Sequence, residues 1–188
     1  MEMDRKIWET VANQCAPVLM DVKPSNLLIL TRAEEERYLG MDGIPGISSL
    51  RLHSGAGKST WLLYRKDRME AVLIWPQVQA FLAQYGYDAQ REAVDRLLER
   101  MAARYARYRE KQDGFPHELG IFLGYPLGDV EGFIRHQGKN YLCAGYWKVY
   151  QDERRARETF QLYRTVRDAV QNMLSAGGSL YEICSFAN

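Results

Sequence analysis

The sequence predicts an α/β (or α+β) protein with a mixed sheet of four to five strands, a β-hairpin, and helices packed on the sheet. Short runs rich in apolar, β-branched and aromatic residues alternate unevenly with longer segments whose apolar residues recur at helical spacing. Two of the strand-like runs flank a glycine-rich turn, which is typical of an antiparallel hairpin. The 188 residues fit a single domain over residues 1–188, and a chain of this size buries roughly 70% of its unfolded surface without disulfides or metals.

The N-terminal part of the chain is expected to form a helix, a strand and a hairpin. Residues 4–15 carry apolar side chains at helical spacing, and Pro17 is expected to end this helix within about a turn. The next expected elements are a turn over 23–26, a strand over 27–31, one or two helical turns over 32–37, a loop over 40–49, and hairpin strands over 50–53 and 59–65.

The remainder is expected to be mostly helical, with a compact strand–turn–helix–strand block from Phe115 to Tyr150. Pro76 interrupts a helical pattern over 68–85 and suits the first position of a second helix. The further expected elements are a helix capped by Asp88 and running to about Lys111, a strand over 118–123, a tight turn over 124–128, a short helix capped by Asp129, a strand over 141–150, a helix over 152–174, and a short strand over 180–183.

Composition excludes several classes of protein. The formal net charge is +1, so bulk charge indicates neither a nucleic-acid nor a membrane partner. No apolar run approaches the roughly 18 residues of a membrane helix, and the charged N-terminus is unlike a signal peptide. Cys15, Cys143 and Cys184 are odd in number and widely spaced, which fits neither a disulfide framework nor a zinc site. We therefore expect a cytoplasmic protein with no metal site that spacing can identify, and the residues indicate no particular cofactor.

The stretch SGAGKST invites comparison with a phosphate-binding loop, but its pattern fails. That loop requires a glycine five residues before the glycine of GK, and this position is Leu52. The residues after Lys58 are strand-like instead of helical. A glycine-rich hairpin turn explains Gly55 and Gly57.

The candidate catalytic residues are Cys15, His117 and Glu118. Cys15 ends an apolar helical stripe, so it is either a small buried hydrophobe or a nucleophile that needs a nearby base. His117 stands at the start of an expected strand beside Glu118, where it could act as a base or simply tie the loop to the backbone. We expect these side chains to meet the polar turn that contains the candidate ligand-binding residues Lys23, Ser25 and Asn26.

Three further candidate ligand-binding residues lie in the block from Phe115 to Tyr150: Tyr125, Tyr146 and Lys148. Tyr125 belongs to a glycine-rich turn that opens a helix, a place where free amides bind anions, although Asp129 at the cap would compete. Strand alternation places Tyr146, Lys148 and Tyr150 on one face, either lining a pocket with one cation or packing under a helix.

The helical segment 88–111 combines arginines with tyrosines, which is a feature of RNA-binding proteins. Seven basic residues against five acidic ones leave it at only +2 (7 − 5). A solvated helix face with internal ion pairs is the favoured interpretation, and nucleic-acid binding is the less favoured alternative.

Three segments together resemble an uncharacterised family, domain-of-unknown-function family 3793: CAPVLMDVKPSNLL (15–28), FPHELGIFLGYPLGDVEGFI (115–134) and GYWKVY (145–150). The resemblance covers nearly the whole chain and implies a cytoplasmic protein of anaerobic bacteria. It brings no established activity, so no catalytic residue follows from it. SGAGKST lies outside these segments.

These observations support three hypotheses on function, and they leave enzymatic activity and oligomeric state open. The first is binding of a small molecule or metal at a pocket that contains Cys15 and His117. The second is a non-catalytic interaction or accessory protein for a redox or metal-handling partner. The third is RNA binding through helix 88–111.

Overall fold

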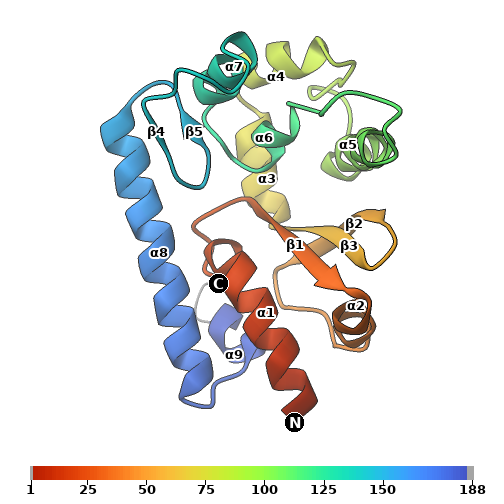
Figure 1. Cartoon of the computed structure of the whole chain (residues 1–188), viewed down its shortest axis with the longest axis vertical. Helices are drawn as coiled ribbons and strands as arrows, with labels where there is room; N and C mark the ends of the chain where they lie inside the picture. Colours follow the sequence, from red (N-terminus) through yellow and green to blue (C-terminus); the bar gives the residue numbers. More distant parts are fainter. Residues whose placement is uncertain (1, 186–188) are drawn as a thin grey trace.

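The computed structural model describes the backbone of residues 2–185 and the side chains of residues 5–185. The fold combines helices and strands and is 54% helical. Figure 1 shows the elements in chain order: α1 (Glu2–Leu19), β1 (Ser25–Thr31), α2 (Arg32–Leu39), β2 (Ser48–Ser54), β3 (Lys58–Tyr64), α3 (Lys66–Leu73), α4 (Pro76–Ala83), α5 (Val94–Arg109), α6 (Leu119–Phe122), α7 (Leu127–Arg135), β4 (Cys143–Ala144), β5 (Lys148–Val149), α8 (Glu153–Ser175) and α9 (Leu180–Ser185).

A three-stranded antiparallel sheet separates two hydrophobic clusters. β3 lies between β1 and β2. Successive side chains of a strand point to opposite faces, and in β3 Leu62 and Tyr64 join one cluster while Trp61 and Leu63 join the other. Burial on both faces explains why β3 has a continuous apolar sequence instead of an alternating one.

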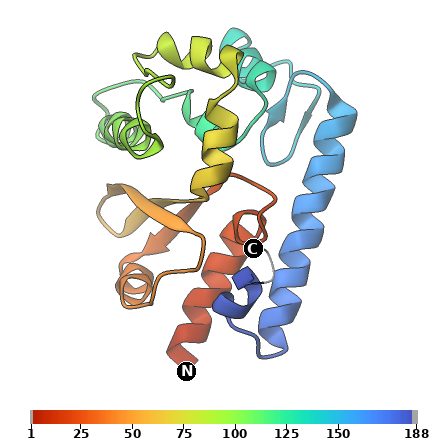
Figure 2. The same ribbon diagram turned by 180° about the vertical axis from the view of Figure 1, so that it is seen from behind.

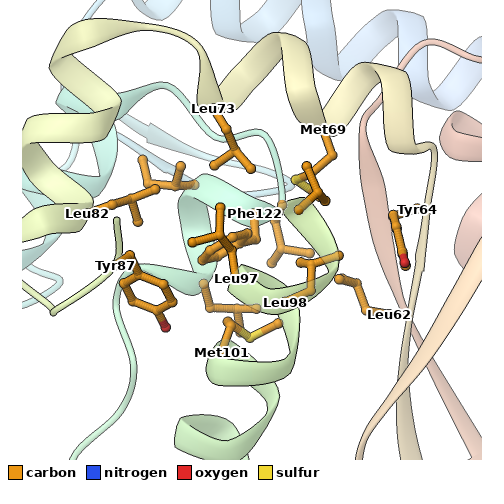
Figure 3. Close-up of a cluster of buried hydrophobic side chains, with 14 of the residues drawn as sticks. Leu62, Tyr64, Met69, Leu73, Leu82, Tyr87, Leu97, Leu98, Met101 and Phe122 are labelled. Carbon is orange, nitrogen blue, oxygen red and sulfur yellow. The ribbon is translucent and has the colours of Figure 1, made fainter. Parts of the chain in front are cut away.

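Different helices cover the two faces of the sheet. One cluster, shown in Figure 3, joins the sheet to α3, α4, α5 and α6. The other joins it to α1, α8 and α9, which lie side by side in both Figure 1 and Figure 2. A third and smaller cluster, of Cys143, Val149, Ala156 and Phe160, holds the β4–β5 hairpin against α8.

Arg65 fixes the end of α1 to the end of β3. The helix ends at Leu19, within about a turn of Pro17, as expected. The buried Arg65 guanidinium donates to the carbonyl oxygens of Val18 (2.9 Å) and Leu19 (2.8 Å), which have no partner within the helix. It also lies 3.4 Å from Asp21. This contact sets the course of the turn that carries Lys23.

Several predicted elements are confirmed. The strand over 27–31 is β1, and the two hairpin strands are β2 and β3. Pro76 occupies the start of α4. The long helix is α8, and the side chain of Asp152 caps it by accepting from the Arg155 amide at 3.2 Å.

The predicted sheet was too large, because two apolar segments that were expected to be strands are helices. Within residues 2–185 the sheets have three and two strands, and every strand pair is antiparallel. Residues 119–122 form α6, and residues 180–185 form α9. A short buried apolar run has the same composition in a helix and in a strand, so periodicity cannot separate them.

The strand expected over 141–150 is broken into two strands of two residues each. The amide of Gly145 donates to the Trp147 carbonyl at 3.0 Å, which closes a tight turn in the middle of the segment. A Cβ on Gly145 would lie 2.4 Å from the Phe160 ring, so the turn can approach α8 only because residue 145 is glycine. The aromatic residues that suggested a long strand instead surround this turn.

Candidate ligand-binding site

A cavity of about 400 Å³ is lined by residues of the 115–148 segment, which contribute α6, α7 and the β4–β5 hairpin. Four aromatic side chains line it, those of Phe115, Tyr125, Phe133 and Trp147. The ionisable side chains in its walls, besides Tyr125, are His117, Asp129 and Lys148. A concave, mainly apolar site with a few polar groups has the general character of a small-molecule pocket.

Close backbone packing positions the floor of this cavity. A Cβ on Gly120 would lie 2.8 Å from Val130 Cγ2 and 3.3 Å from the Tyr125 ring, so α6 and α7 approach each other where no side chain intervenes. Gly124 adopts a φ of +73° and faces Pro24, whose Cγ would lie 2.4 Å from an added Cβ. The glycines of the turn therefore place Tyr125 in the wall and bring this turn against the Lys23–Pro24 segment.

Asp129 holds the hairpin in place instead of capping a helix. The residue that precedes α7 is Pro126 instead of Asp129, so the helix begins three residues earlier than expected, at Leu127, and Asp129 lies inside its first turn. Its Oδ1 accepts from the amides of Tyr150 (2.7 Å) and Gln151 (3.0 Å), and its Oδ2 accepts from Trp147 Nε1 (2.7 Å). The prediction that Asp129 caps this helix was wrong, because the side chain serves three donors far along the chain.

The aromatic walls pack on one another. The Tyr125 and Trp147 rings are stacked with centroids 5.2 Å apart and an interplanar angle of 29°. The His117 ring lies between Phe115 and Phe133, at centroid distances of 5.4 Å and 5.6 Å. Such offset and edge contacts between rings are favourable, so packing within the walls stabilises the shape of the cavity.

Lys148 supplies the cation of the cavity wall. Its ammonium donates to the Gly138 carbonyl at 2.8 Å and lies 5.7 Å and 4.9 Å from the ring centroids of Phe133 and Tyr141. No carboxylate within the described part of the chain forms an ion pair with it. Two of its three N–H groups remain available.

His117 is partly buried, and desolvation lowers its pKa while the neighbouring Glu118 carboxylate raises it to a smaller extent. The net effect favours the neutral imidazole at pH 7. Its ring nitrogens make no hydrogen bond to any residue that the structure describes. A neutral imidazole keeps one donor and one acceptor for a ligand.

Lys23 is a buried cation beside the cavity. Its side chain is buried, with a relative exposure of 3%, and burial lowers its pKa to about 8. The ammonium lies 5.5 Å from the Tyr125 ring centroid and 6.0 Å from that of Tyr163. Within residues 5–185 no hydrogen-bond acceptor or carboxylate contacts it. Lys23 therefore lies behind Tyr125 in the wall of the cavity, although the side chain does not itself line it.

The Cys15–His117 pair does not form. Cys15 is fully buried in the cluster around α1, and its thiol donates to the Leu27 carbonyl at 3.7 Å. Burial raises its pKa to about 12 against a smaller opposing effect of Lys23, so the nucleophilic thiolate is absent at neutral pH. His117, in contrast, contacts Phe115 and Phe133. Cys15 is therefore a small buried hydrophobe, which was one of the two alternatives that its place in the helical stripe left open.

Glu118 points into the core instead of toward the cavity. It is fully buried, and its Oε1 accepts from Arg104 Nε and from the Tyr87 hydroxyl, the latter at 3.1 Å. Its Oε2 has no partner among the described residues. Glu118 thus links α5 to the start of α6.

The remaining candidate residues have separate positions. Ser25 donates to the Phe122 carbonyl at 2.6 Å, which joins β1 to α6. Asn26 is buried on β1, and its Oδ1 has no partner within residues 5–185. Tyr146 packs against Phe160 and Tyr163 on α8, at centroid distances of 5.7 Å and 5.0 Å.

The shared face expected for Tyr146, Lys148 and Tyr150 is absent, because the chain turns over residues 145–147. Of these three only Lys148 lines the cavity, together with Trp147, which strand alternation had placed in the core. Tyr150 stacks on His136 with centroids 5.5 Å apart. Sequence reasoning missed Phe115, Phe133 and Trp147, although their proximity along the chain to His117 and Lys148 was a usable signal.

A second cavity of about 370 Å³ adjoins the first and is more polar. It lies at the start of α8 and is lined by Gln151, Asp152, Arg155 and Thr159 among others. Trp147 and Asp129 belong to the walls of both cavities.

Other parts of the chain carry fewer signs of a site. The side chains of residues 5–185 include no group of three or more metal-binding residues. Among the residues described, no helix has the length and apolar character to cross a membrane. The SGAGK stretch is a hairpin turn in which the Gly55 amide donates to the Lys58 carbonyl at 3.0 Å. On α5 and its flanks, arginines pair with acidic neighbours, as in Arg100–Glu92, Arg104–Glu118 and Arg107–Asp113.

Comparison with known proteins places the sequence in one group. No curated protein and no solved structure matches the chain. The family described as Protein of unknown function (DUF3793) matches residues 11–184. The match includes all three segments that carried the resemblance and every residue of the cavity wall. The chain therefore belongs to the DUF3793 family.

Proposed function

We propose that this chain binds a small molecule with a largely apolar or aromatic body in the cavity between α6, α7 and the β4–β5 hairpin. The observation that supports the proposal is the cavity of about 400 Å³ whose walls contain four aromatic side chains and few polar ones. Cavities of about 300–1,000 Å³ with this character hold small ligands in other proteins.

The aromatic walls favour a ligand with a flat or flexible apolar body. Phe115 is 44% exposed at the edge of the cavity, and Tyr141, which contacts Lys148, is 45% exposed. A ligand that covers these rings would remove apolar surface from water, at about 25 cal/mol per Å². Exposed aromatic side chains beside a cavity are therefore a source of affinity.

The proposal concerns binding and assigns no covalent step. Cys15 lies outside the cavity and remains a thiol, so it does not supply a nucleophile there. A metal ligand set and an RNA-binding surface have no support from the side chains of residues 5–185, since metal-binding groups do not cluster and several arginines of α5 are paired.

Saturation-transfer NMR with two neutral probes, 3-phenylpropan-1-ol and 1-octanol, tests the proposal. The unmodified chain should bind both. Ala144 is exposed and lines the cavity, so Ala144→Trp should cover the opening and abolish the signal. Lys139→Trp is the matched control, because Lys139 is exposed in the connection between α7 and β4 and does not line the cavity.

Circular dichroism and thermal denaturation establish that both variants are folded. Binding by the unmodified chain and by K139W but not by A144W supports the proposal. Absence of any signal at millimolar probe concentration, or equal binding by A144W, overturns it.

A further inference from the structure

The charges around the cavity are unbalanced. Its walls contain Lys148, and Lys23 lies directly behind Tyr125. Neither ammonium has a carboxylate partner among the side chains of residues 5–185. The carboxylate in the wall, Asp129, accepts three hydrogen bonds from neutral N–H groups and offsets one of the two positive charges, so one positive charge is in excess. An ammonium in or beside a poorly solvated cavity gains most from an opposite charge that enters with the ligand.

Two of the four aromatic side chains that line the cavity already contact cations. Lys148 lies 5.7 Å from the Phe133 ring centroid, and Lys23 lies 5.5 Å from that of Tyr125. Aromatic cages for quaternary or methylated ammonium groups depend on free ring faces. A cationic ligand would meet rings that contact Lys148 and Lys23, and both ammonium groups would repel it.

Two hydrogen-bond donors of the cavity wall contact the same aromatic ring. The Phe133 ring contacts His117 (5.6 Å between centroids) and the Lys148 ammonium (5.7 Å to the centroid). Lys148 retains two N–H groups, and His117 has no hydrogen-bond partner among the described residues. An acceptor group of a ligand can therefore meet the charged donor Lys148, and His117 offers a neutral donor on the same ring.

We infer that the ligand is an apolar carboxylic acid, with its aromatic or acyl body between the aromatic walls and its carboxylate on Lys148 beside His117. This inference rests on the proposed function and names the class of ligand. The charge of Lys148 sets the preference for an acid, and the long-range field of Lys23 adds to it.

Isothermal titration with two matched series tests the inference. The first series is 3-phenylpropionate, 3-phenylpropan-1-ol and 3-phenylpropylamine, and the second is octanoate, 1-octanol and octylamine. Within each series the apolar body is constant and only the end group changes. The two series distinguish an aromatic from an acyl body, and either one supports the class.

The unmodified chain at pH 7 should bind the acid at least about tenfold more tightly than the alcohol, since a hydrogen bond to a charged group exceeds a neutral one by about that factor. The amine should bind most weakly. Lys148→Met should reduce the ratio of acid affinity to alcohol affinity to within about twofold, whereas Lys148→Arg should retain much of this preference. Lys139→Met, an exposed lysine outside the cavity, should behave like the unmodified chain.

The outcomes separate the inference from the proposed function. Binding of alcohols without preference for acids overturns the inference alone, as does an acid preference that survives in K148M. Failure of all six probes to bind overturns the proposed function. If K148M does not fold, the test rests on K148R and on the affinities of the acid, alcohol and amine for the unmodified chain. Equal affinities of the three for the unmodified chain refute the inference.

Discussion

Replacing Lys23 with methionine should stabilise the folded chain at neutral pH. The lysine is 3% exposed and has no hydrogen-bond acceptor or carboxylate partner among residues 5–185. Methionine has nearly the same length and keeps the apolar contacts of the stem while it removes the buried charge. Most substitutions of buried residues destabilise a protein, so an increase in the free energy of unfolding would be unusual.

The magnitude follows from the pKa of Lys23. Burial lowers the pKa of Lys23 from 10.5 to about 8. A pKa change of one corresponds to about 1.4 kcal/mol, so the charge on Lys23 destabilises the folded state by about 3 kcal/mol. Contacts with two tyrosine rings offset part of this, at about 0.5–1 kcal/mol each. Lys23→Met should therefore raise the free energy of unfolding by about 1–3 kcal/mol at pH 7.

The pH dependence provides the sharper check. Between pH 8 and 10.5 the unfolded chain retains a proton that the folded chain has lost, so the stability of the unmodified protein rises with pH through this window. Below about pH 8 both states are protonated at this residue and the full cost is present. The advantage of K23M should thus be largest at pH 7 and should shrink toward zero near pH 10.

Urea denaturation of the unmodified chain, K23M and the exposed-site control Lys139→Met at pH 7, 8.5 and 10 measures these differences. Comparison at each pH cancels the titration of all other groups. A K23M variant that is less stable at every pH, or whose advantage does not change with pH, would show that the buried charge is not costly.

Three further predictions concern the walls of the cavity and the core. Asp129→Asn should lower the free energy of unfolding by about 2–4 kcal/mol and shift the fluorescence of Trp147, because an amide can accept fewer of the three N–H groups. Gly120→Ala should cost about 1–3 kcal/mol in urea denaturation, because its Cβ would lie 2.8 Å from Val130. Cys15 should resist alkylation by iodoacetamide in the native state at pH 8, as measured by peptide mass spectrometry, because the thiol is buried and its pKa is about 12.

Each of these has a matched control. Glu131→Gln changes an exposed carboxyl on the same helix and should leave stability within about 0.5 kcal/mol. Gly43→Ala places a methyl group where no atom lies within 4 Å, so a loss equal to that of G120A would contradict the packing argument. Cys15 should become reactive in 6 M guanidinium chloride, and rapid labelling in the native state would show that the core around α1 opens readily.

The fold was predictable where an apolar pattern repeats over many helical turns or where a turn has characteristic residues. Helix α8 repeats its apolar stripe over many turns, Pro76 marks the start of α4, and a glycine-rich turn joins β2 to β3. Prediction failed for α6, α9 and the β4–β5 hairpin. These segments are short and largely apolar or aromatic, and tertiary packing decides their conformation.

The candidate site was predictable in its location along the chain but not in its composition. His117, Tyr125 and Lys148, which the sequence singled out, line the cavity. Cys15 lies elsewhere, because a helical stripe identifies a buried face and cannot tell which distant segment it meets. Trp147 was assigned to the core, because alternation assumes a straight strand and Gly145 turns the chain.

Trp147 makes the two cavities dependent on one another. Its side chain and that of Asp129 belong to the walls of both. The indole ring is held by the hydrogen bond to Asp129, by stacking on Tyr125 and by an edge contact with Phe160. A substitution that removes the hydrogen bond alone costs about 1–3 kcal/mol. Any change at Trp147 therefore alters the wall of the apolar cavity and that of the polar one at the same time.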